Sequence, residues 1–207
     1  MRFEKERREV ARYMKRLVDR KLATVSGGNV SHRIGDLILI TASQTDKAKM
    51  QAREIGIMSM DGRNLTPGLK PSMETKMHLS IYENRKNVQA IVHAHPVFAT
   101  SFAITGKEIK TDLAGEARAV LGIPVFAEYA LMGTSQLAEA VSTASLKSNV
   151  ILMKNHGIIT LGSTLLQAYD RMEVLEATAK ITVITSFLGD ARSLTQEELK
   201  TIDELFE

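Results

Sequence analysis

Three short apolar runs restrict the fold of this chain more than any other feature. They read DLILITAS, NVQAIVHAH and NVILMKNHGIITLG, and the last is broken into two by the turn residues Asn155-His156-Gly157. Each run has the length of a buried strand. Helical patterns separate the runs, but without the strict alternation of strand and helix that builds a parallel sheet. We therefore expect one three-layer α/β domain over residues 1–207, with helices covering a mixed sheet.

Periodicity and helix signals place the remaining elements. The expected helices cover residues 3–22, 73–83, 96–104, 115–121, 134–146, 164–188 and 195–206. Further strands are expected near 108–111, over 123–127, and as a hairpin over 55–65 with Asp61-Gly62 as its two-residue turn. Ser72, Ser163 and Thr195 are the expected N-caps, the last forming a capping box with Glu198. A turn-rich break falls at residues 26–28.

Composition excludes several classes of protein. The chain has 207 residues, 44% of them hydrophobic and 25% charged, and no cysteine for a disulfide or a thiolate metal site. No run of about 18 apolar residues predicts a membrane span, and the charged N-terminal helix lacks the apolar region of a secretory signal. A cytoplasmic location is therefore expected. The net charge of +3, with only 5% aromatic residues, disfavours nucleic acid and suits a small anionic substrate.

Two histidines close the second apolar run. His93 and His95 stand two residues apart in AIVHAHP. Because strand side chains alternate between faces, both imidazoles are expected on one face, with Ala94 on the other. Pro96 ends the strand, which places the pair near solvent at the end of the sheet. Such a pair suits two neutral imidazoles converging on one cation, although strand histidines more commonly bond to neighbouring groups.

A third ligand would have to come from elsewhere in the chain, because a catalytic zinc commonly takes three protein ligands and leaves one position open. His156 has the best setting, since it follows an apolar strand and precedes Gly157, which permits a tight turn. His32 lies in a polar turn or strand and is expected to be exposed, whereas His78 lies on a helix and is expected to pack against the sheet. On spacing alone, a metal site and an ordinary set of hydrogen-bonded histidines stay equally open.

Glu74 is the candidate carboxylate for such a site. It falls in the first turn of the helix expected over 73–83, where the helix dipole favours a negative charge. It is either a plain helix-start acid or a general base beside the metal. A nearby cation would lower its pKa and desolvation would raise it, so the sequence leaves the balance open.

Five separated segments occur in the order seen in the class II aldolase family. They are SGGNVS, ITAS, LKPSMETKMHLSIY, AIVHAHP and LMKNHGIITLG. The chain therefore resembles this family, which contains L-fuculose-1-phosphate aldolase, ribulose-phosphate 4-epimerase and related dehydratases, over roughly residues 5–190. The resemblance implies a central, largely antiparallel sheet with helices on both faces.

The resemblance also implies a metal and a reaction. One zinc ion per subunit, or another divalent metal, would be held by His93, His95 and His156. Glu74 matches the family's acidic residue, which ligates zinc in the resting aldolase and swings away to act as a base. The epimerases carry Asp there, so Glu favours the aldolase branch. The implied activity is cleavage of a ketose, such as L-fuculose 1-phosphate, into dihydroxyacetone phosphate and an aldehyde through a metal-stabilised enediolate.

The substrate's phosphate has a less regular site. The resemblance places it at Gly28, Asn29, Ser43 and Ser72. A Gly-Asn turn and hydroxyl groups are suitable phosphate donors. However, Gln44 stands where a glycine is common, and Met73 stands where a second serine is common. The bulk at position 44 and the lost hydroxyl at position 73 leave open whether the sugar substrate is phosphorylated.

The acid that protonates the departing aldehyde is not defined by the motifs. The family's aldolases use tyrosines, but the matching segment IKTDLAGEARAVLG has none and carries Glu116 instead. Tyr129 matches a widespread family position, although a packed aromatic is its more ordinary interpretation. The family's aldolases are four-fold rings, so a homotetramer is expected, with Glu116 or Tyr129 reaching a neighbour's site.

Two alternatives to an aldolase stay open. One is a dehydratase or 4-epimerase acting on a sugar phosphate, with Glu116 as a base. The other is a non-catalytic binding protein, as in cytoskeletal proteins that resemble the family. Those proteins have lost the metal ligands, whereas this chain retains all three histidines and Glu74.

Overall fold

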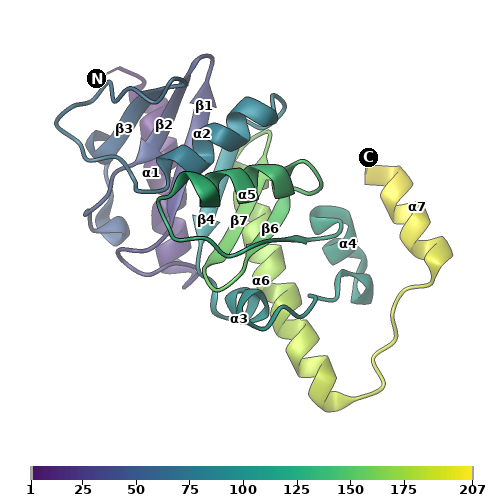
Figure 1. Cartoon of the computed structure of the whole chain (residues 1–207). Helices are drawn as coiled ribbons and strands as arrows, with labels where there is room; N and C mark the ends of the chain where they lie inside the picture. Colours follow the sequence, from purple (N-terminus) through teal and green to yellow (C-terminus); the bar gives the residue numbers. More distant parts are fainter. Residues whose placement is uncertain (1, 207) are drawn as a thin grey trace.

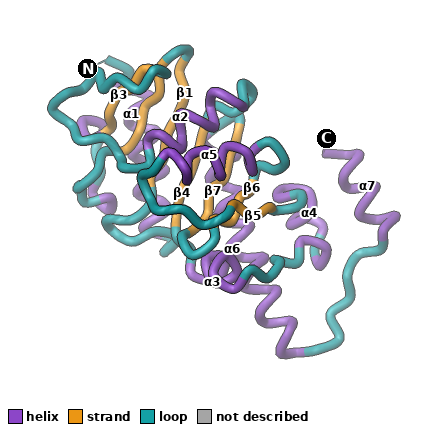
Figure 2. The backbone as a smooth tube through the Cα atoms, in the orientation of Figure 1, coloured by secondary structure: helices purple, strands orange, loops and turns teal. Residues whose placement is uncertain are grey.

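A seven-stranded sheet forms the centre of the computed structural model, which describes residues 2–206 without the side chain of Phe206 (Figures 1 and 2). Its strands are β1 (Asn29–Ile34), β2 (Leu37–Thr41), β3 (Ile55–Ser59), β4 (Ala90–Ala94), β5 (Val125–Ala127), β6 (Val150–Met153) and β7 (Gly157–Gly162). They lie in the order β3-β2-β1-β4-β7-β6-β5, and only the β5–β6 pair is parallel. This arrangement confirms the mixed, largely antiparallel sheet.

Helices cover both faces of the sheet, as predicted. One face packs against α1 (Glu4–Asp19), α3 (Val97–Thr105), α4 (Gly115–Leu121) and α6 (Leu165–Leu188). The other packs against α2 (Thr75–Asn84) and α5 (Ser135–Ser145), which lie side by side in Figure 1. The last helix, α7 (Gln196–Phe206), contacts α4. None of these helices has the length and apolarity that crossing a bilayer requires.

Alternation along the strands divides the apolar side chains into two layers. Leu39 of β2 contributes to the layer under α1, while its neighbours Ile38 and Ile40 contribute to the layer under α2. Likewise Val92 of β4 faces the α1 and α6 side, and Ile91 faces the α2 side. His93 follows this alternation and therefore points to the α2 side of the sheet.

Two parts of the strand pattern differ from expectation. The polar residues around His32 predict either a turn or a strand, and the structure has a strand there, because β1 pairs with both β2 and β4 in the middle of the sheet. The strand expected near 108–111 is absent from the described chain, where Thr111–Leu113 forms a 3-10 turn instead. The Lys110 N–H donates to Thr182 Oγ1 of α6, so this segment is tied to a helix rather than to a strand.

Helix boundaries differ from expectation at two N-caps. Thr164, not Ser163, caps α6, and its Oγ1 accepts from the Gln167 N–H at 3.1 Å. α2 begins at Thr75, two residues later than expected, and Ser72 Oγ accepts from the Glu74 N–H in the turn before it. Glu74 therefore lies at the N-cap position rather than within the first turn.

The expected capping box and hairpin have different outcomes. The capping box is confirmed, because the Thr195 N–H donates to Glu198 Oε2 at 2.7 Å and the Glu198 N–H donates to Thr195 Oγ1 at 3.3 Å. The hairpin after β3 has a three-residue turn rather than the expected two, since the Ser59 N–H bonds to the Arg63 carbonyl and Gly62 adopts a positive φ.

A long-range cap fixes the start of α3, directly after His95. Pro96 occupies the N-cap position of α3 and offers no side-chain hydrogen bond. Glu176 of α6 takes that role, because its carboxylate accepts from the Phe98 and Ala99 N–H groups at 3.1 and 2.9 Å. A carboxylate on these N–H groups also complements the helix dipole. The junction that carries His95 is thereby held to α6.

We expect Glu176→Ala to lower the free energy of unfolding by about 1–3 kcal/mol, because two helix-end N–H groups lose a charged acceptor. Glu173→Ala is the matched control on the same helix, since Glu173 forms ion pairs with the exposed Arg20 and with Arg16. The control should change stability little. Urea unfolding of both variants measures the difference, and equal losses would contradict the capping role.

Candidate metal centre

Three histidine rings converge where β4 and β7 meet. His93 lies on β4, His95 follows β4 directly, and His156 lies in the turn between β6 and β7. One ring nitrogen of each lies within 4.8 Å of the others. The ring centroids are 4.6 to 5.6 Å apart. The predicted convergence of these three imidazoles is therefore confirmed.

His93 is held as a metal ligand would be. Its Nδ1–H donates to the Ile158 carbonyl of β7 at 2.8 Å, so the lone pair of the neutral ring lies on Nε2. Nε2 is buried and lacks an aligned hydrogen-bond partner in the described chain. A buried imidazole nitrogen beside two further imidazole rings and a carboxylate is a fitting donor for a divalent cation. The residues present thus fit the metal that the resemblance implies.

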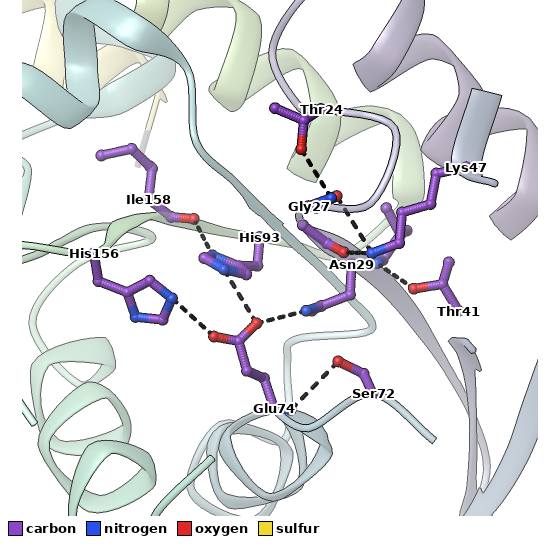
Figure 3. Close-up of polar contacts among 12 residues, drawn as sticks. Thr24, Gly27, Asn29, Thr41, Lys47, Ser72, Glu74, His93, His156 and Ile158 are labelled. Atoms are coloured by element: carbon purple, nitrogen blue, oxygen red, sulfur yellow. Dashed lines mark hydrogen bonds and ion pairs between the residues drawn. The ribbon is translucent and has the colours of Figure 1, made fainter. Parts of the chain in front are cut away.

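Glu74 lies between His93 and His156 (Figure 3). Its Oε2 is 3.1 Å from His93 Nε2, too poorly aligned for a hydrogen bond, and its Oε1 is 3.0 Å from His156 Nε2. Asn29 of β1 donates its side-chain N–H to Oε2 at 2.7 Å. The carboxylate is thus placed at the centre of the cluster and is oriented by an amide from the neighbouring strand.

Charge at the site follows from this packing. Burial by itself raises the pKa of Glu74, but His93 and His156 outweigh burial and hold the pKa of this carboxyl below its usual range. Burial, together with the neighbouring His93 and His156, lowers the pKa of His95 to about 3. His95 is therefore neutral near pH 7, which is the form that binds a metal.

Two glycines let the backbone approach the His95 ring. A Cβ added at Gly157 would lie 2.5 Å from His95 Cδ2 and 2.8 Å from the Ala94 carbonyl oxygen. A Cβ at Gly27 would lie 3.2 Å from His95 Nδ1. The expected reason for Gly157, a tight turn, is wrong, because Asn155 takes the left-handed conformation there at φ 53°. Gly157 is required for close packing against His95 instead.

The two remaining histidines lie outside the cluster. His78 is fully buried on α2, as expected, and its Nδ1 lies 2.7 Å from Ser31 Oγ, which also contacts Tyr82 Oη at 2.8 Å. Burial lowers the pKa of His78 to about 3. His32 of β1 is half-buried rather than exposed, and burial lowers its pKa while Glu6 and Glu9 of α1 oppose that shift. It therefore faces the opposite side of the sheet from His93.

The residues expected at the phosphate lie on three adjoining loops. Gly28 has a φ of 71°, and a Cβ there would lie 2.6 Å from the His93 carbonyl oxygen. The Ser43 N–H donates to the Lys70 carbonyl at 2.9 Å, which joins the loop after β2 to the loop carrying Ser72. The side-chain N–H of Asn29 is already used in a hydrogen bond to Glu74. These contacts bring the loops together, but phosphate binding by these residues stays a proposal.

Gln44 adopts a backbone conformation that glycine favours. Its φ is 59°, in the left-handed region, and its side chain is exposed. That its bulk obstructs the anion stays a prediction. Met73 is 62% exposed and supplies no hydroxyl.

Lys47 is a buried residue that no pattern in the sequence singles out. It begins the 3-10 turn Lys47–Lys49 in a polar loop, yet it is only 5% exposed. Its ammonium donates to the carbonyl oxygens of Gly27, at 3.3 Å, and Gly28. Burial lowers the pKa of Lys47 to about 8, and Glu74 partly opposes that shift. A buried cation thus lies behind the glycine turn, next to the metal centre.

The two candidate acids do not touch the cluster within one chain. Glu116 is exposed in the first turn of α4, and the described chain shows no contact between it and Glu74 or the histidines. Tyr129 is 60% exposed, so its interpretation as a packed aromatic is wrong for the isolated chain. It lies in the segment 128–134 after β5, whose Gly133 lies close to Met73.

We expect Gly157→Ala to weaken metal binding by about 10–100-fold, the effect of disturbing a group that orients a ligand, because the added methyl displaces His95. Gly68→Ala is the control, since a Cβ there meets open space. The His93→Ala/His95→Ala double variant should hold no stoichiometric metal. Titration against a chromogenic chelator measures all three. Wild-type affinity in Gly157→Ala, or full metal content in the double variant, would contradict the assignment.

Comparison with known proteins agrees with this geometry. A model of the class II aldolase and adducin N-terminal domain matches residues 8–183. The chain is 39% identical over 172 residues to an L-fuculose phosphate aldolase from Methanococcus maripaludis, covering 83% of this chain and 93% of the relative. It is 30% identical over 195 residues to a 3-oxo-tetronate 4-phosphate decarboxylase from Haemophilus influenzae, covering 87% and 88%.

The solved structures give the same result for the fold. One L-fuculose 1-phosphate aldolase superposes with a TM-score of 0.90 at 31% identity, covering 100% of this chain and 98% of the other. The matched segment contains the three converging histidines and Glu74. The chain therefore belongs to the class II aldolase and adducin family, as one of its metal-dependent enzymes.

Proposed function

We propose that this enzyme is a zinc-dependent aldolase that cleaves a ketose 1-phosphate into dihydroxyacetone phosphate and an aldehyde. L-Fuculose 1-phosphate is the first substrate to test, because the relatives with that name are among the most similar. The observation that carries the proposal is the placement of Glu74 against His93 and His156. This puts a carboxylate beside a site for one divalent cation.

His93, His95 and His156 would hold the metal, with Glu74 as a further ligand in the resting state. Nitrogen and carboxylate donors suit zinc, and the chain has no cysteine to compete with them. When bound, the cation supplies Lewis-acid stabilisation of the oxygen atoms on which charge develops. The Ile158 carbonyl keeps His93 in the tautomer that this role needs.

Glu74 would move the proton. Cleavage leaves an enediolate, whose carbon must gain a proton before the ketone is released. Glu74 would deliver that proton to the enediolate carbon and would remove it in the condensation direction. Asn29 orients one carboxylate oxygen through its 2.7 Å hydrogen bond, and Ser72 anchors the Glu74 N–H. Both contacts hold the carboxylate in the place where it acts.

Assembly would complete the site. We propose a homotetramer in which Glu116 or Tyr129 reaches the site of a neighbouring subunit, where it would take the proton from the hydroxyl group that becomes the aldehyde and return it in the condensation direction. Both side chains are exposed in a single chain. Two surface hollows lie elsewhere on the chain, one of about 620 Å³ beside α1 and one of about 850 Å³ between α2 and α5. Neither is lined by Glu74 or by the three histidines. A neighbour covering the cluster would also exclude water from the enediolate.

A decarboxylase is the second candidate, because one relative of similar length carries that name. Loss of carbon dioxide from a 3-oxo acid also leaves an enolate-type anion beside the carbonyl. The same cation and the same Glu74 would serve that reaction. The two candidates therefore share the machinery and differ in the bond that is broken.

A panel of substrates separates the candidates. We expect the zinc-loaded enzyme to release dihydroxyacetone phosphate from one or more ketose 1-phosphates, and Glu74→Gln to reduce turnover by about 10²–10⁴, because the amide cannot carry the proton. Metal content should be measured alongside, to separate lost ligation from lost proton transfer. Carbon dioxide release from 3-oxo-tetronate 4-phosphate without aldol cleavage would favour the decarboxylase. Undiminished turnover in Glu74→Gln would contradict its role in either reaction.

Mixing experiments test the shared site. We expect Glu116→Gln to impair turnover while sparing zinc content. Mixed with Glu74→Gln chains, it should regain part of the activity, since some sites in a mixed ring combine intact residues from two subunits. Light scattering gives the oligomeric state. A monomeric mass, or no recovery despite demonstrated subunit exchange, would exclude this role for Glu116.

A further inference from the structure

Lys47 is a buried cation without a carboxylate partner. The described chain shows no ion pair for it, and its hydrogen-bond acceptors are the carbonyl oxygens of Gly27 and Gly28 (Figure 3). An ammonium group has three N–H donors, so two are used and one is left. A buried charge without a direct ion pair is costly to keep in a folded protein, and Glu74 offsets the cost at Lys47 only in part. An anion from outside the chain would offset the remainder.

The place of Lys47 matches such an anion. Its backbone N–H donates to the Val25 carbonyl at 3.0 Å, so the 3-10 turn is attached to the loop that precedes Gly28. Ala42 forms an isolated bridge with Pro71, which attaches the loop after β2 to the loop that carries Ser72. The side chain of Lys47 thus enters at the junction of the three loops on which the hydroxyl and glycine groups for a phosphate lie.

We propose that Lys47 is a specificity-determining residue that binds the phosphate dianion of the substrate through its remaining N–H donor and its charge. The inference rests on the proposed function for the identity of the substrate. A charge-assisted bond to phosphate is stronger than a bond from a neutral hydroxyl.

A purely structural role for Lys47 makes a different prediction. In that case the ammonium only fastens the Gly27–Gly28 turn, and any donor able to reach the two carbonyl oxygens would serve. Lys47→Gln keeps an N–H donor but removes the charge, whereas Lys47→Arg keeps the charge. Lys49→Gln is the matched control, because Lys49 lies on the same 3-10 turn with a side chain that is 85% exposed.

Calorimetric titration of inorganic phosphate into the zinc-loaded proteins tests the proposal without any turnover. We expect Lys47→Gln to weaken phosphate binding by at least about tenfold, Lys47→Arg to retain most of it, and Lys49→Gln to differ from wild type by less than about twofold. Acetate should bind wild type more weakly than phosphate. Zinc content and melting temperature are measured for every variant.

Three results would overturn the proposal. The first is wild-type phosphate affinity in a folded, zinc-loaded Lys47→Gln protein. The second is loss of zinc or of the fold in both Lys47 variants, which would assign the residue a structural role. The third is acetate binding that equals phosphate binding and depends on Lys47, which would identify the ligand as a carboxylate. Because no reaction is measured, a failed aldolase assay leaves these outcomes distinguishable.

Discussion

The pairing of β4 with a strand on each side sets the position and the hydrogen bonds of His93 at the centre of the site. In the sheet register His93 is opposite Asn29 of β1 and opposite Ile159 of β7. One neighbour therefore supplies the amide that orients Glu74, and the other supplies the Ile158 carbonyl that fixes the His93 ring. A shift of one residue in either pairing would turn His93 to the opposite face of the sheet. His93 thus depends on sheet register, whereas His156 and Glu74 come from the turn before β7 and from the N-cap of α2.

The α2 side of the sheet carries a buried polar column that adjoins the metal centre. Ser31 connects His78 and Tyr82 by hydrogen bonds of 2.7 and 2.8 Å. His78 lies one helical turn after Glu74, and its N–H donates to the Glu74 carbonyl. Buried polar groups cost stability unless they are paired, so this column is a region where packing and function constrain each other. It ties the start of α2, and hence Glu74, to the strand next to β4.

Local patterns in the sequence predicted a three-layer α/β domain and the pairing of His93 with His95, whereas the largely antiparallel sheet and the three-histidine ligand set were implied by the resemblance to the family. Apolar runs identified β2, β4, β6 and β7, and strand alternation placed His93 and His95 together. The choice between a turn and a strand at β1 could not be made from the sequence, because a central strand can be polar when side chains from α2 satisfy it. Glu176 and Lys47 were missed because their partners lie far along the chain, at Phe98 and at Gly28. Interactions of that kind leave no periodic signal in the sequence.

Gln44, one of the two departures from the family pattern, lies on the loop that leads to Lys47. Gln44 keeps the left-handed backbone that a glycine would adopt, so the path of its loop does not require glycine. A residue other than glycine in this conformation carries a cost in stability, and such conformations persist where the surroundings fix them. The same loop leads directly to Lys47, whose side chain is buried although its neighbour Lys49 is exposed. The same loop thus carries an exposed residue in a left-handed conformation and, shortly after it, a buried cation, so the path of the loop decides which side chain reaches the Gly27–Gly28 turn.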